Sequence, residues 1–136
     1  EMKIAEQKNQ PITAMMLDID HFKSINDTCG HLSGDAVLAK CAKIITNSMR
    51  KQDIAFRFGG DEFYVLMPNT AIDEAFVVAE RLRANIGNSI IVQNVPVTTS
   101  IGVAERIFGE TSVAWYKRLD QALYKAKINS GNQVAR

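Results

Sequence analysis

The clearest structural signal in this chain lies in residues 54–67, Ile54-Ala-Phe-Arg-Phe-Gly-Gly-Asp-Glu-Phe-Tyr-Val-Leu-Met67. Apolar and aromatic residues alternate with other residues on both sides of Gly59-Gly60, as they do along strands with one buried face. A tight turn between two antiparallel strands requires positive φ angles, which glycine adopts without steric cost. The segment therefore predicts a β-hairpin whose tip carries the carboxylates of Asp61 and Glu62.

A second strand is predicted upstream of this hairpin, at Thr13-Ala-Met-Met-Leu-Asp-Ile19. The run is short, almost wholly apolar and preceded by Pro11, which is typical of a strand that is buried on both faces. It ends in two carboxylates, Asp18 and Asp20. Because ligands of open α/β sheets bind beyond the carboxyl ends of strands, this end is a candidate binding site.

Helices and strands alternate along the rest of the chain. Apolar residues at helical spacing predict helices over residues 33–49, 70–86 and 115–126. Ser33 and the capping-box-like Thr70-x-x-Asp73 are the expected starts of the first two. Strand-like runs lie at 90–92, 97–104 and 132–135, the last as an edge strand, and the polar residues 1–10 are typical of a helix end or a linker. This order predicts an α/β (α+β-like) fold with a mixed central sheet flanked by helices.

Composition excludes several classes of protein. The chain has 136 residues, 46% of them hydrophobic and 23% charged, which suits one packed domain. A net charge of +1 argues against nucleic-acid binding and against membrane contact through a polybasic patch. No apolar run approaches the roughly 20 residues of a membrane-spanning helix. The two cysteines, Cys29 and Cys41, lack metal-ligand spacing, and a reducing cytoplasm is the expected location.

Three carboxylates form the first candidate site. If the hairpin lies beside the strand at 13–19, then Asp18, Asp61 and Glu62 converge at one edge of the sheet. Such a cluster repels itself unless cations neutralise it, and Mg²⁺ is the first candidate among cations that prefer oxygen ligands. Mg²⁺ beside two glycines, which let a ligand approach the backbone, suits nucleotide phosphates. The alternative is that these acids are only solvated turn formers.

The run Arg57-Phe-Gly-Gly-Asp-Glu-Phe63 matches the signature for which the GGDEF family of bacterial diguanylate cyclases is named. Four further blocks resemble the family in order and spacing: Leu17-Asp-Ile-Asp-His-Phe-Lys-Ser-Ile-Asn-Asp27, Gly30-His-Leu-Ser-Gly-Asp35, Thr98-Thr-Ser-Ile-Gly-Val-Ala104 and Asp120-Gln-Ala-Leu-Tyr-Lys-Ala-Lys127. The resemblance covers nearly the whole chain. It implies a GGDEF fold like that of nucleotide cyclases and the polymerase palm, and the condensation of two GTP molecules to cyclic di-GMP with release of two pyrophosphates.

The resemblance also implies roles for individual residues. Mg²⁺, or Mn²⁺, would be bound by the Asp18 side chain, the Ile19 carbonyl oxygen and Asp61, with Glu62 as a further ligand. Either Asp61 or Glu62 would accept the proton of the attacking 3′-hydroxyl, and Lys23 would stabilise the developing phosphate charge. The remaining GTP contacts would be Asn26, His31, Asp35, Gly59, Gly60 and Lys127, with Asn26 and Asp35 at the guanine edge and His31 lining the same pocket. Taken singly, these residues have ordinary alternatives as a surface lysine, a turn, a loop residue or a helix cap.

A second site is implied by Arg50-Lys-Gln-Asp53, which resembles the product-inhibition site of the family. An arginine can donate two hydrogen bonds to guanine O6 and N7, and an aspartate can accept from the amino group. We therefore expect cyclic di-GMP to bind at Arg50 and Asp53 and to inhibit the enzyme. The alternative is an arginine at a helix end beside a turn aspartate.

The chain departs from the family pattern near both ends. The family places Gly-Arg-Asn after its last helix, whereas Gly131 stands here where that arginine would contact the triphosphate. Losing a guanidinium weakens phosphate binding, so a lower GTP affinity is expected. The upstream family block Asp-x-Leu-Thr-x-Leu-x-Asn-Arg is absent. We therefore expect residues 1–136 to be one GGDEF domain at the C-terminal end of a longer sensory protein, which is cytoplasmic or membrane-anchored.

Two functions compete. The first is a diguanylate cyclase that needs a homodimer for turnover, because one domain holds one GTP and two must face each other. The second is a weak or inactive domain that binds GTP or cyclic di-GMP and passes a signal to a partner. The retained pair Asp61 and Glu62 favours catalysis. A third hypothesis, a protein-interaction domain, predicts that changing Asp61 leaves nucleotide binding unaffected.

Overall fold

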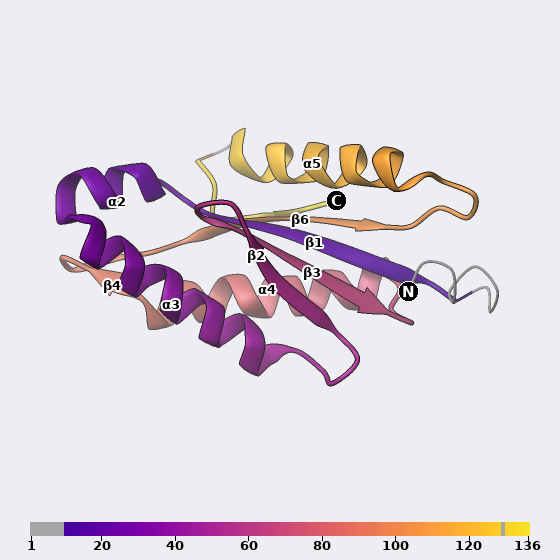
Figure 1. The fold of residues 1–136 in the computed structure, drawn as a ribbon, viewed down its shortest axis with the longest axis horizontal. Helices are drawn as coiled ribbons and strands as arrows, with labels where there is room; N and C mark the ends of the chain where they lie inside the picture. The colour runs from indigo at the N-terminus through magenta and orange to yellow at the C-terminus, as the bar shows by residue number, and fades with distance from the viewer. Residues whose placement is uncertain (1–9, 129) are drawn as a thin grey trace.

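A five-stranded sheet lies at the centre of the protein. The computed structural model describes residues 10–128 and 130–136 (Figure 1). The sheet has the order β2-β3-β1-β6-β7, with β1 in the middle. Its strands are β1 (Ile12–Ile19), β2 (Ile54–Phe58), β3 (Glu62–Pro68), β6 (Thr99–Glu105) and β7 (Val134–Ala135). All neighbours are antiparallel except β6 and β7, which are parallel, so the prediction of a mixed sheet with a terminal edge strand is confirmed.

Helices cover both faces of this sheet (Figure 1). One face packs against α3 (His31–Ser48) and α4 (Ile72–Ser89), and the other packs against α5 (Ser112–Ile128). Helix α2 (Phe22–Cys29) follows the carboxyl end of β1 and precedes α3. Two short strands, β4 (Ile91–Val92) and β5 (Val95–Pro96), form a separate hairpin. None of the helices that the structure describes is long and apolar enough to cross a membrane.

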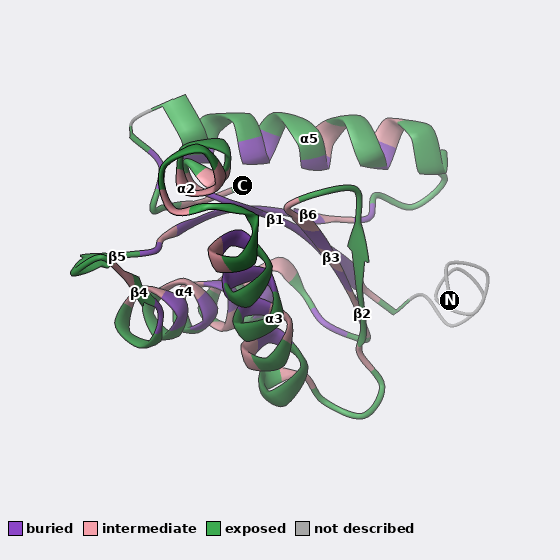
Figure 2. Cartoon of the chain, turned by 60° about the vertical axis from the view of Figure 1, so that its left-hand side comes forward, coloured by how far each residue is buried: buried purple, intermediate pink, exposed green. Residues whose placement is uncertain are grey.

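Strand β1 is buried along its whole length, as its apolar sequence predicts (Figure 2). Its side chains alternate between two apolar clusters, because successive residues of a strand point to opposite faces. Leu17 and Ile19 pack toward α3 and α4, whereas Met16 packs toward α5. The alternation therefore assigns Asp18 to the face that α5 covers.

Helix α5 lies close against β6. A Cβ atom at Gly102 would come within 2.3 Å of the Leu123 backbone nitrogen, so only glycine allows this approach. The Trp115 indole N–H donates a hydrogen bond of 2.9 Å to the Ala104 carbonyl. These contacts hold α5 in place, and its last turn carries Lys127 near the carboxyl end of β1.

Both predicted helix caps were wrong. Helix α3 begins at His31, with Gly30 at φ 90° before it, so Ser33 lies inside the first turn. Helix α4 is preceded by Ala71, which has no capping side chain, and the Ile72 N–H donates a hydrogen bond of 2.8 Å to the Glu105 carboxylate. The Thr70 hydroxyl instead donates a hydrogen bond of 2.9 Å to the Pro68 carbonyl. Neither helix therefore begins with the local capping side chain that its sequence suggested.

Helix α2 (Phe22–Cys29) was not among the helices predicted from apolar spacing, and a turn at Asn26-Asp27 was considered only as an alternative to a binding role. Helix α2 does turn two apolar side chains, Phe22 and Ile25, toward the core, but it has only eight residues and none is fully buried, so its helical period is short. The helix end or linker predicted for residues 1–10 lies outside the described residues, apart from Gln10.

Candidate active site

The register of the sheet brings the end of β1 to the tip of the β2–β3 hairpin. Asp18 lies opposite Glu62 across the β1–β3 pair. The Ile19 N–H donates a hydrogen bond of 3.4 Å to the Asp61 carbonyl oxygen. The predicted proximity of the hairpin and the first strand is therefore confirmed, although Asp18 and Asp61 lie 43 residues apart in the sequence.

The Asp18 carboxyl group is the buried acid of this site, with only 7% of the residue exposed. Its Oδ2 accepts an ion-paired hydrogen bond from Lys127, while its Oδ1 is buried and has no hydrogen-bond partner among the described residues. Burial, followed by the neighbouring Asp61 carboxylate, raises the pKa of Asp18 to about 7, and Lys127 counteracts only part of this effect. When Asp18 is ionised, its negative charge is therefore only partly balanced by Lys127.

Lys127 supplies the positive charge at this site. Burial lowers the pKa of Lys127, but the carboxylates of Asp18, Asp61 and Glu62 outweigh that effect and raise it. Lys127 therefore stays an ammonium ion. Its side chain is 42% exposed, so it can reach solvent or a ligand as well as Asp18.

These residues border a cleft of about 360 Å³, which we call the acidic cleft. Its wall combines the end of β1, the start of α2, the hairpin tip and the segment that follows α5. It is lined by Asp18, Ile19, Asp20, His21, Phe22, Lys23, Asp61, Lys127, Ser130 and Gly131. The predicted catalytic and metal residues on β1, Lys23 and Asp61 therefore share one opening.

The donor set of the acidic cleft suits a hard divalent cation in one respect. A buried carboxylate oxygen without a partner, beside a second carboxylate, is relieved when a cation binds. Glu62 differs, because its Oε1 accepts a hydrogen bond of 3.2 Å from the Tyr64 hydroxyl. Within the part of the chain that the structure describes, no three acidic, histidine or cysteine side chains converge as a metal site does. Two carboxylates meet where three were expected, and ligation by Glu62 stays a prediction.

The three residues predicted at the guanine lie at the corner between α2 and α3. Asn26 packs over Gly34, where an added Cβ atom would come within 1.8 Å of the Asn26 Oδ1. His31 and Asp35 are exposed and lie one turn apart on α3, so they share a helix face. The structure brings these residues to adjacent helices, but none is among the residues that line the acidic cleft.

The two glycines of the hairpin tip are exposed. Gly59 has a φ of 75°, as the turn requires, whereas Gly60 does not have a positive φ. No atom lies within 4 Å of where a Cβ would stand at either position. The tip is therefore open to a ligand on its outer side.

Asp20 is a site residue whose role the sequence analysis missed. Its carboxylate accepts hydrogen bonds from the Thr98 hydroxyl at 2.7 Å, from the Ser100 hydroxyl at 2.6 Å and from the Asn132 N–H at 2.8 Å. A signal was available, because Asp20 repeats the two-residue spacing of β1 and so shares a face with Asp18. Its partners lie about 80 and 110 residues further along the chain, beyond the reach of local patterns.

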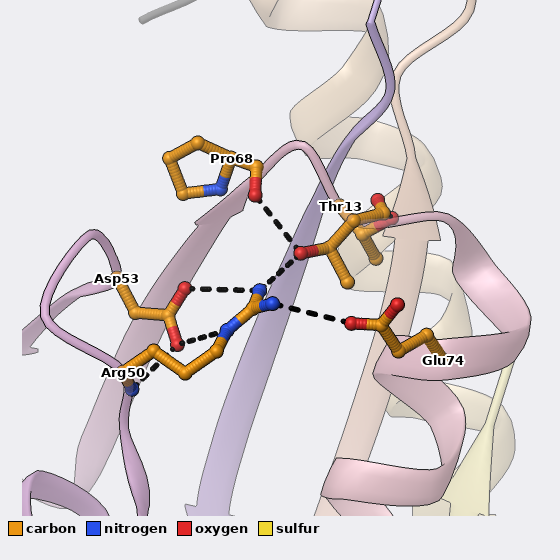
Figure 3. Close-up of polar contacts among 6 residues, drawn as sticks. Thr13, Arg50, Asp53, Pro68 and Glu74 are labelled. Atoms are coloured by element: carbon orange, nitrogen blue, oxygen red, sulfur yellow. Dashed lines mark hydrogen bonds and ion pairs between the residues drawn. The ribbon is translucent and has the colours of Figure 1, made fainter.

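The predicted inhibitory site lies at the other end of β2, in a group that we call the Arg50 cluster: Arg50, Asp53, Thr70 and Glu74 (Figure 3). The Asp53 side chain is 1% exposed and accepts a hydrogen bond of 2.9 Å from the Arg50 backbone N–H. The Arg50 guanidinium bonds to both Asp53 oxygens at 3.4 Å, to the Glu74 Oε2 at 3.2 Å and to the Thr70 hydroxyl. Arg50 and Asp53 are thus brought together and already paired.

Beside the Arg50 cluster lies a second cleft, of about 370 Å³. Its lining includes Arg50, Asp53, Glu74 and a further cation, Arg81. Five residues of β2 separate this end of the hairpin from its tip, which at about 3.4 Å per residue is roughly 17 Å. A ligand in this second cleft would therefore lie outside the acidic cleft.

Comparison with known proteins agrees with this geometry. The family model for "Diguanylate cyclase, GGDEF domain" matches residues 1–133. Diguanylate cyclase A of Treponema denticola is 42% identical over 132 residues, which cover 94% of this chain and 36% of that protein. Response regulator PleD of Caulobacter vibrioides is 40% identical over 139 residues, which cover 98% of this chain and 31% of that protein. The chain thus spans about a third of the length of these curated relatives.

Solved structures show the same fold. The GGDEF domain of DgcB from Caulobacter crescentus, in complex with c-di-GMP, matches with a TM-score of 0.94 and 33% identity over 98% of this chain and 82% of that one. The active GGEEF domain of a diguanylate cyclase from Vibrio cholerae matches with a TM-score of 0.92 and 36% identity over 98% and 87% of the two chains. Sequence, fold and the meeting of β1 with the Gly-Gly-Asp-Glu hairpin all lead to the same conclusion: the chain belongs to the GGDEF family of diguanylate cyclase domains.

Proposed function

We propose that this domain condenses two GTP molecules to cyclic di-GMP with release of two pyrophosphates. The observation that carries the proposal is the buried Asp18 Oδ1 without a partner, held beside Asp61 in the acidic cleft. The names of the relatives, which are diguanylate cyclases at about 40% identity, support this reaction. Because the relatives are about three times longer, the activity of the whole protein is part of the proposal.

Magnesium, or manganese in its place, would be bound by Asp18, the Ile19 carbonyl oxygen and Asp61, with Glu62 as a further ligand. When bound, the cation neutralises phosphate charge and favours departure of pyrophosphate. The orphaned oxygen of Asp18 supports this assignment. The Tyr64 hydroxyl donates a hydrogen bond to the Glu62 Oε1, so the Oε2 is the oxygen that would bind the cation.

Two lysines and one acid act directly on the reacting groups. Lys23, exposed on α2, and Lys127, which is paired with Asp18 but partly exposed, both line the acidic cleft and would contact the phosphates there. Asp61 or Glu62 takes the proton from the 3′-hydroxyl as its oxygen attacks the α-phosphorus and the bond to pyrophosphate breaks. Fixed charges of this kind stabilise the transition state without reorganising as the reaction proceeds.

Guanine recognition is assigned to the corner between α2 and α3. An Asp35 carboxylate accepts hydrogen bonds from guanine N1 and N2, and the Asn26 amide donates to the ring acceptors. His31 lies one turn from Asp35 and borders the same place. The open hairpin tip at Gly59 and Gly60 allows the nucleotide to pass close to the backbone.

Turnover requires two copies of the domain, because each binds one GTP and the product joins two. Residues 1–136 would form a single domain of a longer cytoplasmic or membrane-anchored protein, whose other parts bring the two copies together. Activity would then rise more steeply than linearly with protein concentration.

Cyclic di-GMP would inhibit the enzyme by binding at Arg50 and Asp53. The Arg50 guanidinium matches the acceptors of guanine, and the adjoining cleft has room beside it. The complex of the related DgcB domain with c-di-GMP supports binding of this ligand. Because Glu74 already pairs with Arg50, the ligand must displace that contact.

The test is incubation of the full-length protein with GTP and Mg²⁺, with products identified by mass spectrometry. Formation of cyclic di-GMP, absent in Asp61→Asn and retained in Asp120→Asn on the exposed face of α5, is the expected result. GTP hydrolysis alone, or binding of GTP without turnover, would favour the alternative, a signalling module that binds GTP or cyclic di-GMP. Nucleotide binding that is unchanged in Asp61→Asn would favour a protein-interaction domain.

A further inference from the structure

The segment after α5 makes an unusual turn, which we call the post-helix turn: Ser130, Gly131 and Asn132. All three residues have positive φ angles, of 72°, 72° and 52°. Residues other than glycine rarely adopt this conformation, and two of the three, Ser130 and Asn132, are not glycine, so the turn needs support from the rest of the molecule. Ser130 and Gly131 also line the acidic cleft.

Asp20 provides this support. Its carboxylate Oδ2 accepts the Asn132 N–H at 2.8 Å, and its two oxygens accept the hydroxyls of Thr98 and Ser100 at 2.7 and 2.6 Å. The Asp20 N–H donates to the Thr98 carbonyl at 2.9 Å. Asp20 therefore joins the end of β1, the start of β6 and the post-helix turn through charge-assisted hydrogen bonds, which are stronger than neutral ones.

The same contact explains the glycine at position 131. A Cβ atom there would lie 2.6 to 2.8 Å from the carboxyl carbon and both oxygens of Asp20. The carboxylate cannot move aside without giving up its three hydrogen bonds. A side chain at position 131, including the arginine of the family pattern, is therefore incompatible with Asp20 in this arrangement.

We propose that Asp20 is a positioning residue for the phosphate end of the acidic cleft. It holds the post-helix turn against β1, and so fixes the end of α5, where Lys127 faces Asp18. In this chain the anchored backbone of the turn forms the wall that an arginine side chain would otherwise form. The part of this inference that concerns phosphate rests on the proposed function, whereas the anchoring of the turn does not.

The anchoring is tested by hydrogen exchange of the full-length protein without nucleotide. Asp20→Asn removes the charge and one acceptor oxygen at almost constant volume. Exchange of the Asn132 amide is expected to rise about tenfold or more, because its acceptor is weakened. Thr99→Val is the matched control: the Thr99 hydroxyl is buried on the same strand without a partner among the described residues, so exchange should stay at the wild-type rate. An Asn132 amide equally protected in Asp20→Asn would overturn the proposal.

The positioning role is tested by steady-state kinetics with GTP and Mg²⁺. Asp20→Asn is expected to raise KM for GTP about tenfold and to change kcat less, since binding of the triphosphate is affected first. A merely structural role would reduce the active fraction, and hence kcat, with KM unchanged, and that result would overturn the role. If Asp20→Asn does not fold, Thr98→Val and Ser100→Ala each remove one hydrogen bond from the carboxylate and should shift KM in the same direction. Wild-type protein that binds no GTP would instead refute the proposed function, while the exchange result would stand.

Discussion

The buried carboxylates at the two ends of the β2–β3 hairpin differ in how far their negative charge is balanced by hydrogen bonds and cations. At the tip, Asp18 is buried beside a second carboxylate, and one of its oxygens has no partner. At the base, the buried Asp53 carboxylate is matched by a backbone N–H and a guanidinium (Figure 3). The tip is therefore arranged to gain from a cation, whereas the base is already satisfied and a ligand there must compete with internal contacts. The proposed substrate site and the proposed inhibitory site differ in this way.

The largest expected effect is at the tip. Asp61→Asn keeps the shape of the side chain but removes the negative charge beside Asp18. Turnover of GTP is expected to fall about 10³-fold, which corresponds to about 4 kcal/mol of transition-state stabilisation. Cyclic di-GMP formation is measured by chromatography. A variant that retains more than a tenth of the wild-type rate would show that Asp61 does not take part in the reaction.

The next effect is at the base. Arg50→Ala removes the guanidinium that is expected to contact guanine. The affinity for cyclic di-GMP, measured by isothermal titration calorimetry, should fall by about 10- to 100-fold, as expected for a loss of about 1–3 kcal/mol. Lys51→Ala, which changes an exposed neighbouring cation, is the control. Equal affinities in the wild type and Arg50→Ala would show that the product does not bind here.

Replacing the buried aspartate by asparagine is expected to change the stability of the protein in opposite directions at the two ends of the hairpin. Asp53→Asn breaks satisfied hydrogen bonds and is expected to lower the free energy of unfolding by about 1–2 kcal/mol. Asp18→Asn, studied in EDTA, removes a carboxylate whose raised pKa means that ionisation costs stability. That cost is absent below the unfolded pKa near 3.8, grows as the pH rises and is complete above about 7.

Thermal melts at pH 5 and pH 8 measure this difference. The Tm of Asp18→Asn relative to the wild type should increase from pH 5 to pH 8, while Asp53→Asn should lie below the wild type at both. Lys127, which is partly exposed, keeps its hydration when Asp18 is neutral, so loss of the ion pair costs little. A relative Tm of Asp18→Asn that falls with rising pH would contradict the conclusion that the negative charge of Asp18 is only partly balanced.

The smallest effect concerns Glu74, whose side chain is 58% exposed. Its ion pair with Arg50 is a surface pair, worth about 0.2–1 kcal/mol. Removing this competitor with Glu74→Gln should raise the affinity for cyclic di-GMP by up to about fivefold, in the direction opposite to Arg50→Ala. Glu80→Gln, on the same helix, is the control. An unchanged affinity would mean that Glu74 does not compete with the ligand.

Much of this fold could be predicted from local patterns. The Gly59-Gly60 pair between alternating runs identified the hairpin, and the apolar run before Asp18 identified the central strand. Helix α2 was missed because it spans only eight residues, and its core-facing side chains Phe22 and Ile25 are too few to establish a helical period. The predicted caps at Ser33 and Thr70 were wrong because both helices begin at other residues. The Thr70 hydroxyl bonds to the Pro68 carbonyl, and the Ile72 N–H is bound by Glu105, 33 residues further along the chain and beyond the reach of a local motif.

The amino-acid order alone specifies which groups are available: acids after a buried strand, acids after two glycines, a lysine near the end of the last helix and an arginine three residues before an aspartate. Periodicity and turn chemistry are local, so they can be recognised in one sequence. Which of these groups meet is set by strand register and by the close packing of α5 on β6, which bring Asp18, Asp61 and Lys127 together and leave Glu62 with Tyr64. The contact between Asp20 and the post-helix turn joins residues 112 positions apart, and only the folded chain makes that glycine necessary.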